Sequence, residues 1–225
     1  MIADNIKDVT LRISRCCEKA GRPASSVKLI CVTKEADICR MEEVIGLGFK
    51  DLGENRIQDA IVKYRSIGNR AAWHLVGHLQ TNKVKDAVMI FSLIHSVDSQ
   101  RLAKEISQEA RKIGKVQDIL IQINTSGEES KFGIAPCEAA DFFKEVSLYP
   151  NISILGLMTI APEVDDPQNA RPCFRRLREL RDKLKNLQLT TYNLQLSMGM
   201  TNDFEVAIEE GATMVRIGRA IFRDA

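Results

Sequence analysis

The stretch that decides the fold is Val27–Lys34, VKLICVTK. Its continuous apolar and β-prone residues are typical of a strand that is buried on both faces, as in a parallel sheet. The run ends at Lys34, which places a lysine at the carboxyl end of the strand. Apolar surroundings there would disfavour the charged ammonium and make the amine a candidate for Schiff-base formation. The strand alone equally allows a lysine whose long stem carries the ammonium out to solvent.

The composition is that of a soluble globular protein. The 225 residues are 44% hydrophobic and 28% charged, which suits one α/β barrel domain over residues 1–225. A net charge of +2 gives no reason to expect nucleic acid or an anionic membrane as a partner. No apolar run approaches the roughly 20 residues of a membrane span, and the charged N-terminal segment does not resemble a signal peptide. We therefore expect a cytoplasmic protein with reduced cysteines and, from the scattered histidines and cysteines, no metal site.

Strand-like and helix-like segments alternate along the chain. The predicted strands are Val27–Thr33, Phe49–Glu54, Ala71–Val76, Phe91–Val97, Asp118–Asn124, Ile152–Thr159, Tyr192–Ser197 and Met214–Gly218. The predicted helices span residues 2–20, Ile38–Leu47, Ile57–Ile67, Gln80–Ala87, Gln100–Ile113, Pro136–Ser147, Pro167–Leu187 and Asp203–Glu210. Glycines that follow several of these helices, such as Gly48 and Gly114, are typical helix stops.

This alternation predicts a parallel sheet with right-handed crossovers. Eight such units are the number that closes a (β/α)8 TIM barrel. Because little chain follows the eighth strand, we expect the N-terminal helix to cover the seam where the last outer helix of a barrel normally lies. A doubly wound open sheet is the alternative, but neither GxGxxG nor GxxxxGKS follows the first strand.

Polar residues follow the predicted strands at the ends where barrels carry their active sites. They include Lys34, the GEN motif with Asn55, the loop at His78, Asp98, and the segments Ser197–Asp203 and Arg216–Gly218. The last two segments follow strands seven and eight, which frequently bind phosphate in these barrels. The alternative is an ordinary helix cap after a buried strand.

The segment SMGMTND at 197–203 has the groups that phosphate binding needs. Ser197 and Thr201 supply hydroxyl donors, and Gly199 and Gly218 allow a close backbone approach. Asn202 or Asp203 can cap the following helix, while Arg216 adds a fixed charge with fork geometry. A phosphate site opposite a Schiff-base lysine points to pyridoxal 5′-phosphate (PLP). If Arg216 faces the pyridine nitrogen, it would not keep that nitrogen protonated, which suits a carrier better than a general aminotransferase.

Other motifs allow two interpretations each. Trp73–His74 fits core packing with a hydrogen-bonded histidine as well as a ligand role, and His78 has no carboxylate nearby in sequence. The run Ser126–Lys131 is either a solvated loop or part of the site. The segment Phe174–Lys185 is most simply a solvated outer helix, although an RNA-binding patch is the alternative.

Several motifs together resemble the pyridoxal phosphate homeostasis protein family, small single-domain relatives of the alanine racemase barrel. The motifs are VTK at 32–34, GEN at 53–55, WHLVGHLQTNK at 73–83, HSVDS at 95–99, QINTSGEESKFG at 122–133, GLMTI at 156–160 and LSMGMTNDFEVAIEEGATMVRIGRAIF at 196–222. Three positions depart from the family pattern: Thr33 replaces a serine, Arg56 a tyrosine, and the chain ends FRDA where a glycine commonly follows the phenylalanine.

The resemblance implies that Lys34 holds PLP covalently and that Arg216 lies near the pyridine ring. The residues assigned to cofactor binding are Lys34, Asn55, Ser197, Met198, Gly199, Thr201, Arg216 and Gly218. It also implies a monomeric, non-catalytic PLP carrier or regulator, with PLP-dependent apo-enzymes as candidate recipients.

Two alternatives remain open. A racemase-type PLP enzyme needs a second acid or base, commonly a tyrosine from an extra domain for which this chain has no room, and Tyr64, Tyr149 and Tyr192 fall away from the predicted active face. A cofactor-free Schiff-base aldolase would use the same loops to hold a sugar phosphate.

Overall fold

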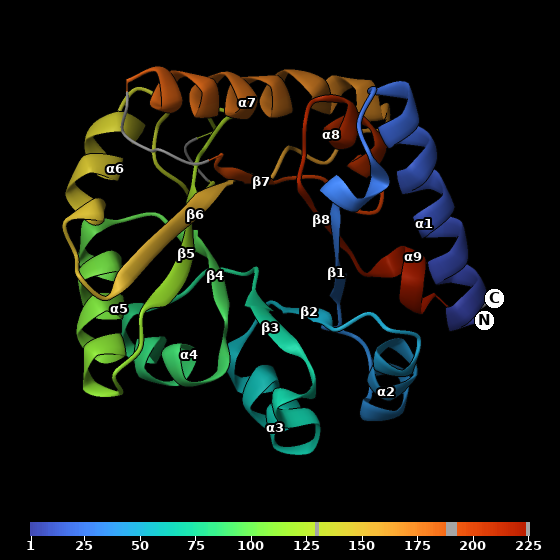
Figure 1. Cartoon of the computed structure of the whole chain (residues 1–225), viewed down its shortest axis with the longest axis horizontal. Helices are drawn as coiled ribbons and strands as arrows, with labels where there is room; N and C mark the ends of the chain where they lie inside the picture. The colour runs from blue at the N-terminus through green and yellow to red at the C-terminus, as the bar shows by residue number, and fades with distance from the viewer. Residues whose placement is uncertain (129–130, 188–192, 224–225) are drawn as a thin grey trace.

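The computed structural model describes residues 1–128, 131–187 and 193–223. In this part of the chain, eight parallel strands pair in sequence order and β8 pairs with β1, which closes the barrel (Figure 1). The strands are β1 (Lys28–Val32), β2 (Asp51–Glu54), β3 (Ala72–Leu75), β4 (Leu93–Val97), β5 (Gln117–Gln122), β6 (Ile152–Met158), β7 (Gln195–Ser197) and β8 (Met214–Ile217). The predicted (β/α)8 TIM barrel is thereby confirmed, and the open doubly wound sheet is wrong.

Helices surround the strands as an outer ring (Figure 1). They are α1 (Ile2–Lys19), α2 (Ile38–Gly46), α3 (Ile57–Ile67), α4 (Val84–Ile90), α5 (Gln100–Lys112), α6 (Ala139–Ser147), α7 (Arg171–Asn186), α8 (Phe204–Glu209) and α9 (Arg219–Phe222). Short 3-10 turns occupy Ala24–Ser26, Gly68–Arg70, Thr81–Lys83 and Pro167–Ala170. No helix among the described residues combines the length and apolarity that crossing a membrane requires.

The N-terminal helix covers the last unit of the barrel, as the sequence predicts. Helix α1 packs against α8 and α9 (Figure 1). The side chain of Asn5 donates to the backbone oxygens of Ile221 at 3.0 Å and Arg223 at 3.2 Å, which ties α1 to the end of the described chain. The sequence pattern did not reveal the four-residue helix α9, because so short a segment shows no hydrophobic periodicity.

Several element boundaries differ from the prediction. The helix expected over Pro167–Leu187 is a 3-10 turn followed by α7, which begins at Arg171 with Pro172 in its first turn. Proline lacks the N–H that a helix interior needs, so the α-helix starts there. The helix expected at Gln80–Ala87 begins at Val84 after a 3-10 turn. Strand β7 starts at Gln195, and Tyr192 of the predicted strand lies outside the described residues.

The strands pack on two sides. Their outward side chains meet the helices in one large apolar core, whose fully buried members include Trp73, Phe91 and Phe174. A smaller apolar cluster fills part of the barrel interior and consists of Ile30, Leu93, Leu120, Met158 and Met214. Because side chains alternate along a strand, Arg216 shares the inward face of β8 with Met214.

Candidate functional site

A cavity of about 550 Å³ opens at the carboxyl ends of the strands. This volume lies within the range of small-molecule sites. The cavity lining brings together five of the eight residues predicted from the sequence, namely Lys34, Asn55, Thr201, Arg216 and Gly218. These residues come from β1, β2, β7 and β8 or the loops that follow them. Residues that were selected because they follow predicted strands therefore line one common cavity, although they lie far apart in the chain.

Lys34 lies at the rim of this cavity. Its Nζ is 3.3 Å from Glu35 Oε1, and 43% of the lysine side chain is exposed. The apolar burial expected from the strand run does not extend to the amine, because the strand ends at Val32, two residues before the lysine. The amine faces an open cavity and is accessible to a ligand there.

A buried ion pair holds the backbone next to Lys34. Lys63 Nζ on α3 donates to Glu54 Oε1 at 2.8 Å and to the backbone oxygen of Thr33 at 2.6 Å. The Thr33 hydroxyl also donates to Glu54 Oε1, at 2.5 Å. Glu54 is fully buried, and its second oxygen has no hydrogen-bond partner. The contacts among Lys63, Glu54 and Thr33 fix the ends of β1 and β2 relative to each other. The sequence pattern did not predict them.

Arg216 forms part of the cavity lining and is 4% exposed. Its Nη1 donates to Ser197 Oγ at 2.6 Å, and its Nη2 donates to the backbone oxygen of Thr159 at 2.9 Å. Burial lowers the pKa of Arg216 to about 10, opposed by the nearby carboxylate of Asp203. The guanidinium therefore stays charged at neutral pH and is fixed by two hydrogen bonds.

The loop after β7 makes a tight turn beside the cavity. Gly199 has φ of +92°, and a Cβ at this position would lie 2.6 Å from Ala207 Cβ and 2.8 Å from Phe204 Cα. Asp203 precedes α8, but its carboxylate accepts from the backbone N–H of Met200 at 2.6 Å rather than capping the helix. Burial raises the pKa of Asp203, an effect partly offset by that hydrogen bond. The turn needs glycine and directs Thr201 to the cavity.

Ser197, Met198 and Gly199 do not line the cavity. Ser197 is fully buried beneath it, where its hydroxyl contacts Arg216. Met198 is fully buried in the outer core between the sheet and the helices. The alternation of side chains at the end of β7 accounts for the difference, because Ser197 points inward and Met198, the residue after the strand, points outward.

Gly218 brings the start of α9 close to β1. A Cβ at Gly218 would lie 2.9 Å from the backbone oxygen of Val32. The Thr201 hydroxyl accepts from the backbone N–H of Ala220 at 3.4 Å. The hydroxyl of the loop after β7 thus meets the backbone of α9, and Thr201 and Gly218 both line this side of the cavity.

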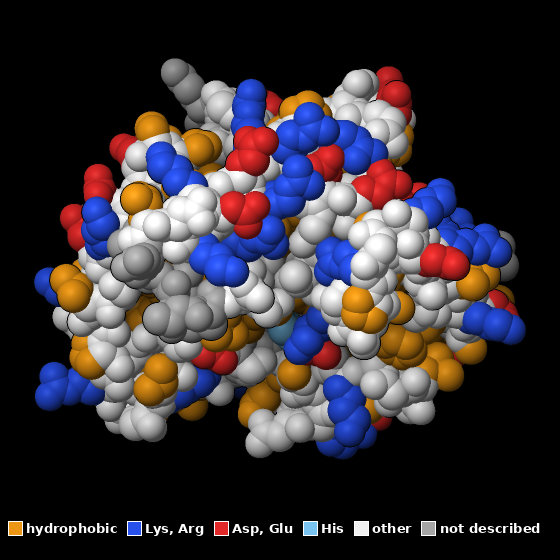
Figure 2. Space-filling view, turned by 45° about the horizontal axis from the view of Figure 1, so that its top comes forward, with side chains coloured by type: hydrophobic (Ala, Val, Ile, Leu, Met, Phe, Trp, Pro, Cys, Tyr) orange, Lys and Arg blue, Asp and Glu red, His pale blue; other side chains and the backbone are white. Residues whose placement is uncertain are grey.

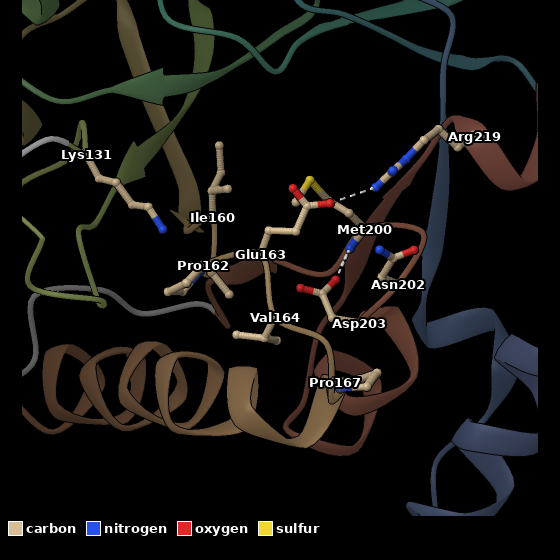
Figure 3. Close-up of a pocket in the computed structure, with 11 residues that line it drawn as sticks. Lys131, Ile160, Pro162, Glu163, Val164, Pro167, Met200, Asn202, Asp203 and Arg219 are labelled. Carbon is tan, nitrogen blue, oxygen red and sulfur yellow. Dashed lines mark hydrogen bonds and ion pairs between the residues drawn. The ribbon is translucent and has the colours of Figure 1, made fainter.

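A second cavity of about 310 Å³ adjoins the first. The two share Ile160, Glu163, Met200 and Arg219. Figure 3 shows Arg219 and Glu163 as an ion pair, which measures 3.5 Å. Lys131 lies on the opposite side of this cavity. Lys131, the last residue of the Ser126–Lys131 run, therefore lines the second cavity. Residues 129 and 130 lie outside the described part of the chain.

The structure distinguishes the two interpretations of Trp73–His74 and gives His78 a partner. His78 does have a carboxylate partner, Asp98, at 3.7 Å, and its ring stacks on Phe132 with centroids 3.9 Å apart. The partner follows β4, so sequence proximity could not reveal it. Trp73 is 2% exposed in the outer core, and His74 is 3% exposed and hydrogen-bonded inside the barrel. The core interpretation of Trp73–His74 is the one that the structure supports.

The arginines of α7 are engaged within the molecule. Arg171, Arg175 and Arg178 all pair with Glu210, whose side chain is only 5% exposed. Figure 2 shows Lys and Arg side chains interspersed with Asp and Glu side chains on this face. Two arginines of the basic run, Arg175 and Arg178, therefore pair with one buried carboxylate.

The fold and site define a barrel of the alanine racemase N-terminal class. The family model described as "Alanine racemase, N-terminal domain" matches residues 8–225. A protein of Aquifex aeolicus (strain VF5), named Pyridoxal phosphate homeostasis protein, is 44% identical over 223 residues, which are 97% of this chain and 96% of the relative. The chain belongs to the pyridoxal phosphate homeostasis protein family, as its motifs predict.

Solved structures agree with this assignment. PipY of Synechococcus elongatus PCC7942, solved with PLP bound, has a TM-score of 0.85 and 31% identity, with 99% of this chain and 100% of that chain covered. An unknown protein from Bifidobacterium adolescentis has a TM-score of 0.91 and 37% identity, with 98% and 94% covered.

Proposed function

We propose that this protein binds PLP in the 550 Å³ cavity, holds it reversibly through Lys34, and serves intracellular PLP homeostasis. The observation that supports this most directly is the shared cavity: an accessible lysine, a fixed arginine and the Thr201–Gly218 wall face one another. The PLP found in the related PipY structure supports the same ligand.

The residues present fit PLP group by group. PLP supplies an aldehyde that an amine can bond reversibly and a ring that can delocalise electrons. The Lys34 amine is accessible for the aldehyde, and the charged Arg216 can face the ring nitrogen. Thr201 and Gly218 would hold the phosphate. A side chain at Gly218 would collide with the backbone of Val32, so the glycine lets the backbone come close at this wall of the cavity. Asn55 would contact the cofactor from the β2 side.

The other three predicted residues would act indirectly. Ser197 would hold Arg216 rather than the phosphate, because its hydroxyl accepts from the guanidinium. Gly199 would shape the turn that presents Thr201, and Met198 would anchor this turn in the outer core.

A carrier role fits this site better than turnover. Arg216 would not keep the ring nitrogen protonated, so the cofactor would be a weak electron sink. Tyr64 on α3 donates to the side chain of Asn69 at 2.7 Å, and Tyr149 packs at the outer core, so neither tyrosine lines the cavity. Tyr192 lies outside the described residues. We accordingly propose a non-catalytic, cytoplasmic monomer, acting as one barrel over residues 1–225, that supplies PLP-dependent apo-enzymes.

Borohydride trapping tests the proposed attachment. PLP-loaded protein is reduced, digested and analysed by mass spectrometry, and we expect the modification at Lys34. Lys34→Ala should abolish both the adduct and the visible absorption band, whereas Lys131→Ala, at the adjoining cavity, should retain both. An adduct at Lys131 in place of Lys34, or none at all, would overturn the proposal.

A racemase-type enzyme is the second candidate, favoured by the match to the alanine racemase N-terminal domain model. The PLP-loaded protein is incubated with L-amino acids in deuterated water, and Cα–H exchange and D-isomers are measured. The carrier proposal predicts no turnover above free PLP. Exchange at ordinary enzymatic rates would instead establish the racemase function.

A further inference from the structure

A chain of hydrogen bonds runs through the barrel interior to Arg216. Asp51 Oδ1 at the start of β2 lies 2.9 Å from His74 Nε2, and His74 Nδ1 lies 3.0 Å from His95 Nε2. His95 Nδ1 lies 2.9 Å from Ser197 Oγ, which accepts from Arg216 Nη1 at 2.6 Å. Strands β2, β3, β4, β7 and β8 each contribute one member. The chain therefore connects the amino-terminal end of β2 to the cavity at the opposite end of the barrel.

The two ends of the chain determine the direction of the bonds between them. An ionised Asp51 can only accept, so neutral His74 carries its proton on Nε2 and accepts on Nδ1. His95 then donates from Nε2, and its Nδ1 accepts the hydroxyl proton of Ser197. Arg216 can only donate, and a lone pair of Ser197 accepts that bond. Every donor thus points toward Asp51.

The surroundings of His95 keep its imidazole neutral, as this arrangement requires. Burial, together with the cations that face it (His74 when protonated, Arg216 and Lys28), holds the pKa of His95 well below its usual value. Lys28 Nζ also donates to Asp51 Oδ1 at 3.0 Å, which keeps that carboxylate ionised at the end of the chain. Asp51 has a lowered pKa, because its hydrogen bonds to His74 and Lys28 outweigh its burial. The reverse direction would place an imidazolium at His74 and leave the Ser197 proton without the acceptor that it has here.

We propose that His74 and His95 are positioning residues for Arg216, which act through Ser197 and take their proton arrangement from Asp51. The chain directs a lone pair of Ser197 at Arg216 Nη1, while Thr159 accepts from Nη2. Two donors of the guanidinium are thereby fixed inside the barrel, and its orientation at the cavity is set from the far end of the molecule. The consequence for a bound cofactor rests on the proposed PLP function.

Packing alone does not account for the chain. The neighbouring interior is filled by the apolar cluster of Ile30, Leu93, Leu120, Met158 and Met214. Burial of two imidazoles costs free energy of hydration that apolar side chains in the same place would not lose. Hydrogen bonds offset this cost only if every polar atom is paired. Here each ring nitrogen of His74 and His95 has a partner, and the last partner is an arginine of the cavity lining.

The first test uses the apo-protein and no cofactor. Long-range ¹H–¹⁵N correlation spectra report which nitrogen of each imidazole carries the proton, and the sequence has only three histidines. His78→Gln identifies the signal of the exposed one. We expect His74 and His95 both to carry the proton on Nε2. Ser197→Ala should shift the His95 signals and Ser197→Thr should restore them, whereas Ser96→Ala, a buried serine on the same strand as His95 without a hydrogen-bond partner, should leave them unchanged. A proton on Nδ1 of either residue overturns the proposal.

The second test asks whether the far end of the chain affects the site. Asp51 is the most exposed of the five members, with 26% of its side chain accessible, so Asp51→Asn is the variant best tolerated by the fold. We expect Asp51→Asn and Ser197→Ala to change the visible absorption maximum of the PLP-loaded protein, and Ser96→Ala to leave it at the wild-type position. Unchanged spectra in both variants would refute the positioning role. If the wild-type protein takes up no PLP, the proposed function fails, while the tautomers of the apo-protein still decide the chain.

Discussion

Lys63 Nζ lies 2.6 Å from the backbone oxygen of Thr33, so a lysine of α3 holds the residue that precedes Lys34. The same amine neutralises Glu54, which is fully buried. Lys63→Met leaves that carboxylate without its charge partner, and removal of one member of a buried pair costs about 3–5 kcal/mol. We expect a loss of this size in the free energy of unfolding, measured by urea denaturation. PLP affinity should also fall, because the end of β1 loses a tether.

The double variant Lys63→Met/Glu54→Gln controls for loss of the lysine itself. Its second change removes the buried charge, so it should recover part of the stability that Lys63→Met loses. Equal stability of the single and double variants would show that the charge of Glu54 is not what Lys63 compensates.

Gly199 provides a test of the loop after β7. Gly199→Ala must accommodate a Cβ 2.8 Å from the Cα of Phe204, in a backbone conformation with φ of +92°. Gly48→Ala is its matched control, because Gly48 has φ of +93° and a Cβ there would meet nothing within 4 Å. The control should lose about 1–2 kcal/mol of stability from backbone strain alone. Gly199→Ala should lose a further 1–3 kcal/mol or so from overpacking, together with PLP binding.

The unfolding of this protein should depend on pH through His95. Burial holds the pKa of His95 well below its usual value, so the folded state keeps it neutral while the unfolded chain takes up a proton below about pH 6.5. Because the unfolded state binds more protons in this range, the free energy of unfolding falls on acidification, by up to about 1.4 kcal/mol per pH unit. Urea unfolding between about pH 7.5 and 5.5 measures this slope. His95→Gln should flatten it, and an unchanged slope in that variant would contradict the assignment.

Two carboxyl groups contribute with the opposite sign. Burial raises the pKa of Asp98 and of Asp203, so in acid the folded state binds protons before the unfolded chain does. Acidification through that range favours the folded state. Because both pKa values are raised, this contribution begins above the carboxyl pKa of the unfolded chain, about 3.9, and is complete below it, so the His95 slope is best measured toward neutral pH.

The sequence predicted the fold and the residues at the strand ends for one physical reason. In a barrel, the position of a residue just after a strand determines which face it occupies, so Lys34, Thr201 and Gly218 could be assigned to one cavity from their order in the chain. Ser197 was assigned to the same cavity, but it sits one layer lower, where its hydroxyl meets Arg216. Depth within the barrel depends on strand register, which the sequence does not display.

The contacts that position the site could not be predicted in this way. Lys63 and Glu54 meet because α3 packs on β2, and His95 meets Ser197 across the interior although 102 residues separate them in the chain. From the sequence alone, Lys63 is consistent with the solvated face of a helix, and His95 is consistent with a core histidine. Tertiary packing brings these partners together, through α3 on β2 in the first case and through the closed barrel in the second.

Arg216→Lys tests whether the site depends on the fork geometry of the guanidinium. A lysine retains the charge but cannot donate to Ser197 and Thr159 from two fixed nitrogens, as Arg216 does. Loss of one hydrogen bond from a charged donor should lower the free energy of unfolding by about 1.5–3 kcal/mol and alter the absorption spectrum of bound PLP. Arg176→Lys is the control, because Arg176 donates to the backbone oxygen of Thr125 and does not line the cavity. That variant should keep the wild-type spectrum; if Arg216→Lys keeps it as well, charge alone at position 216 is sufficient for the cofactor site.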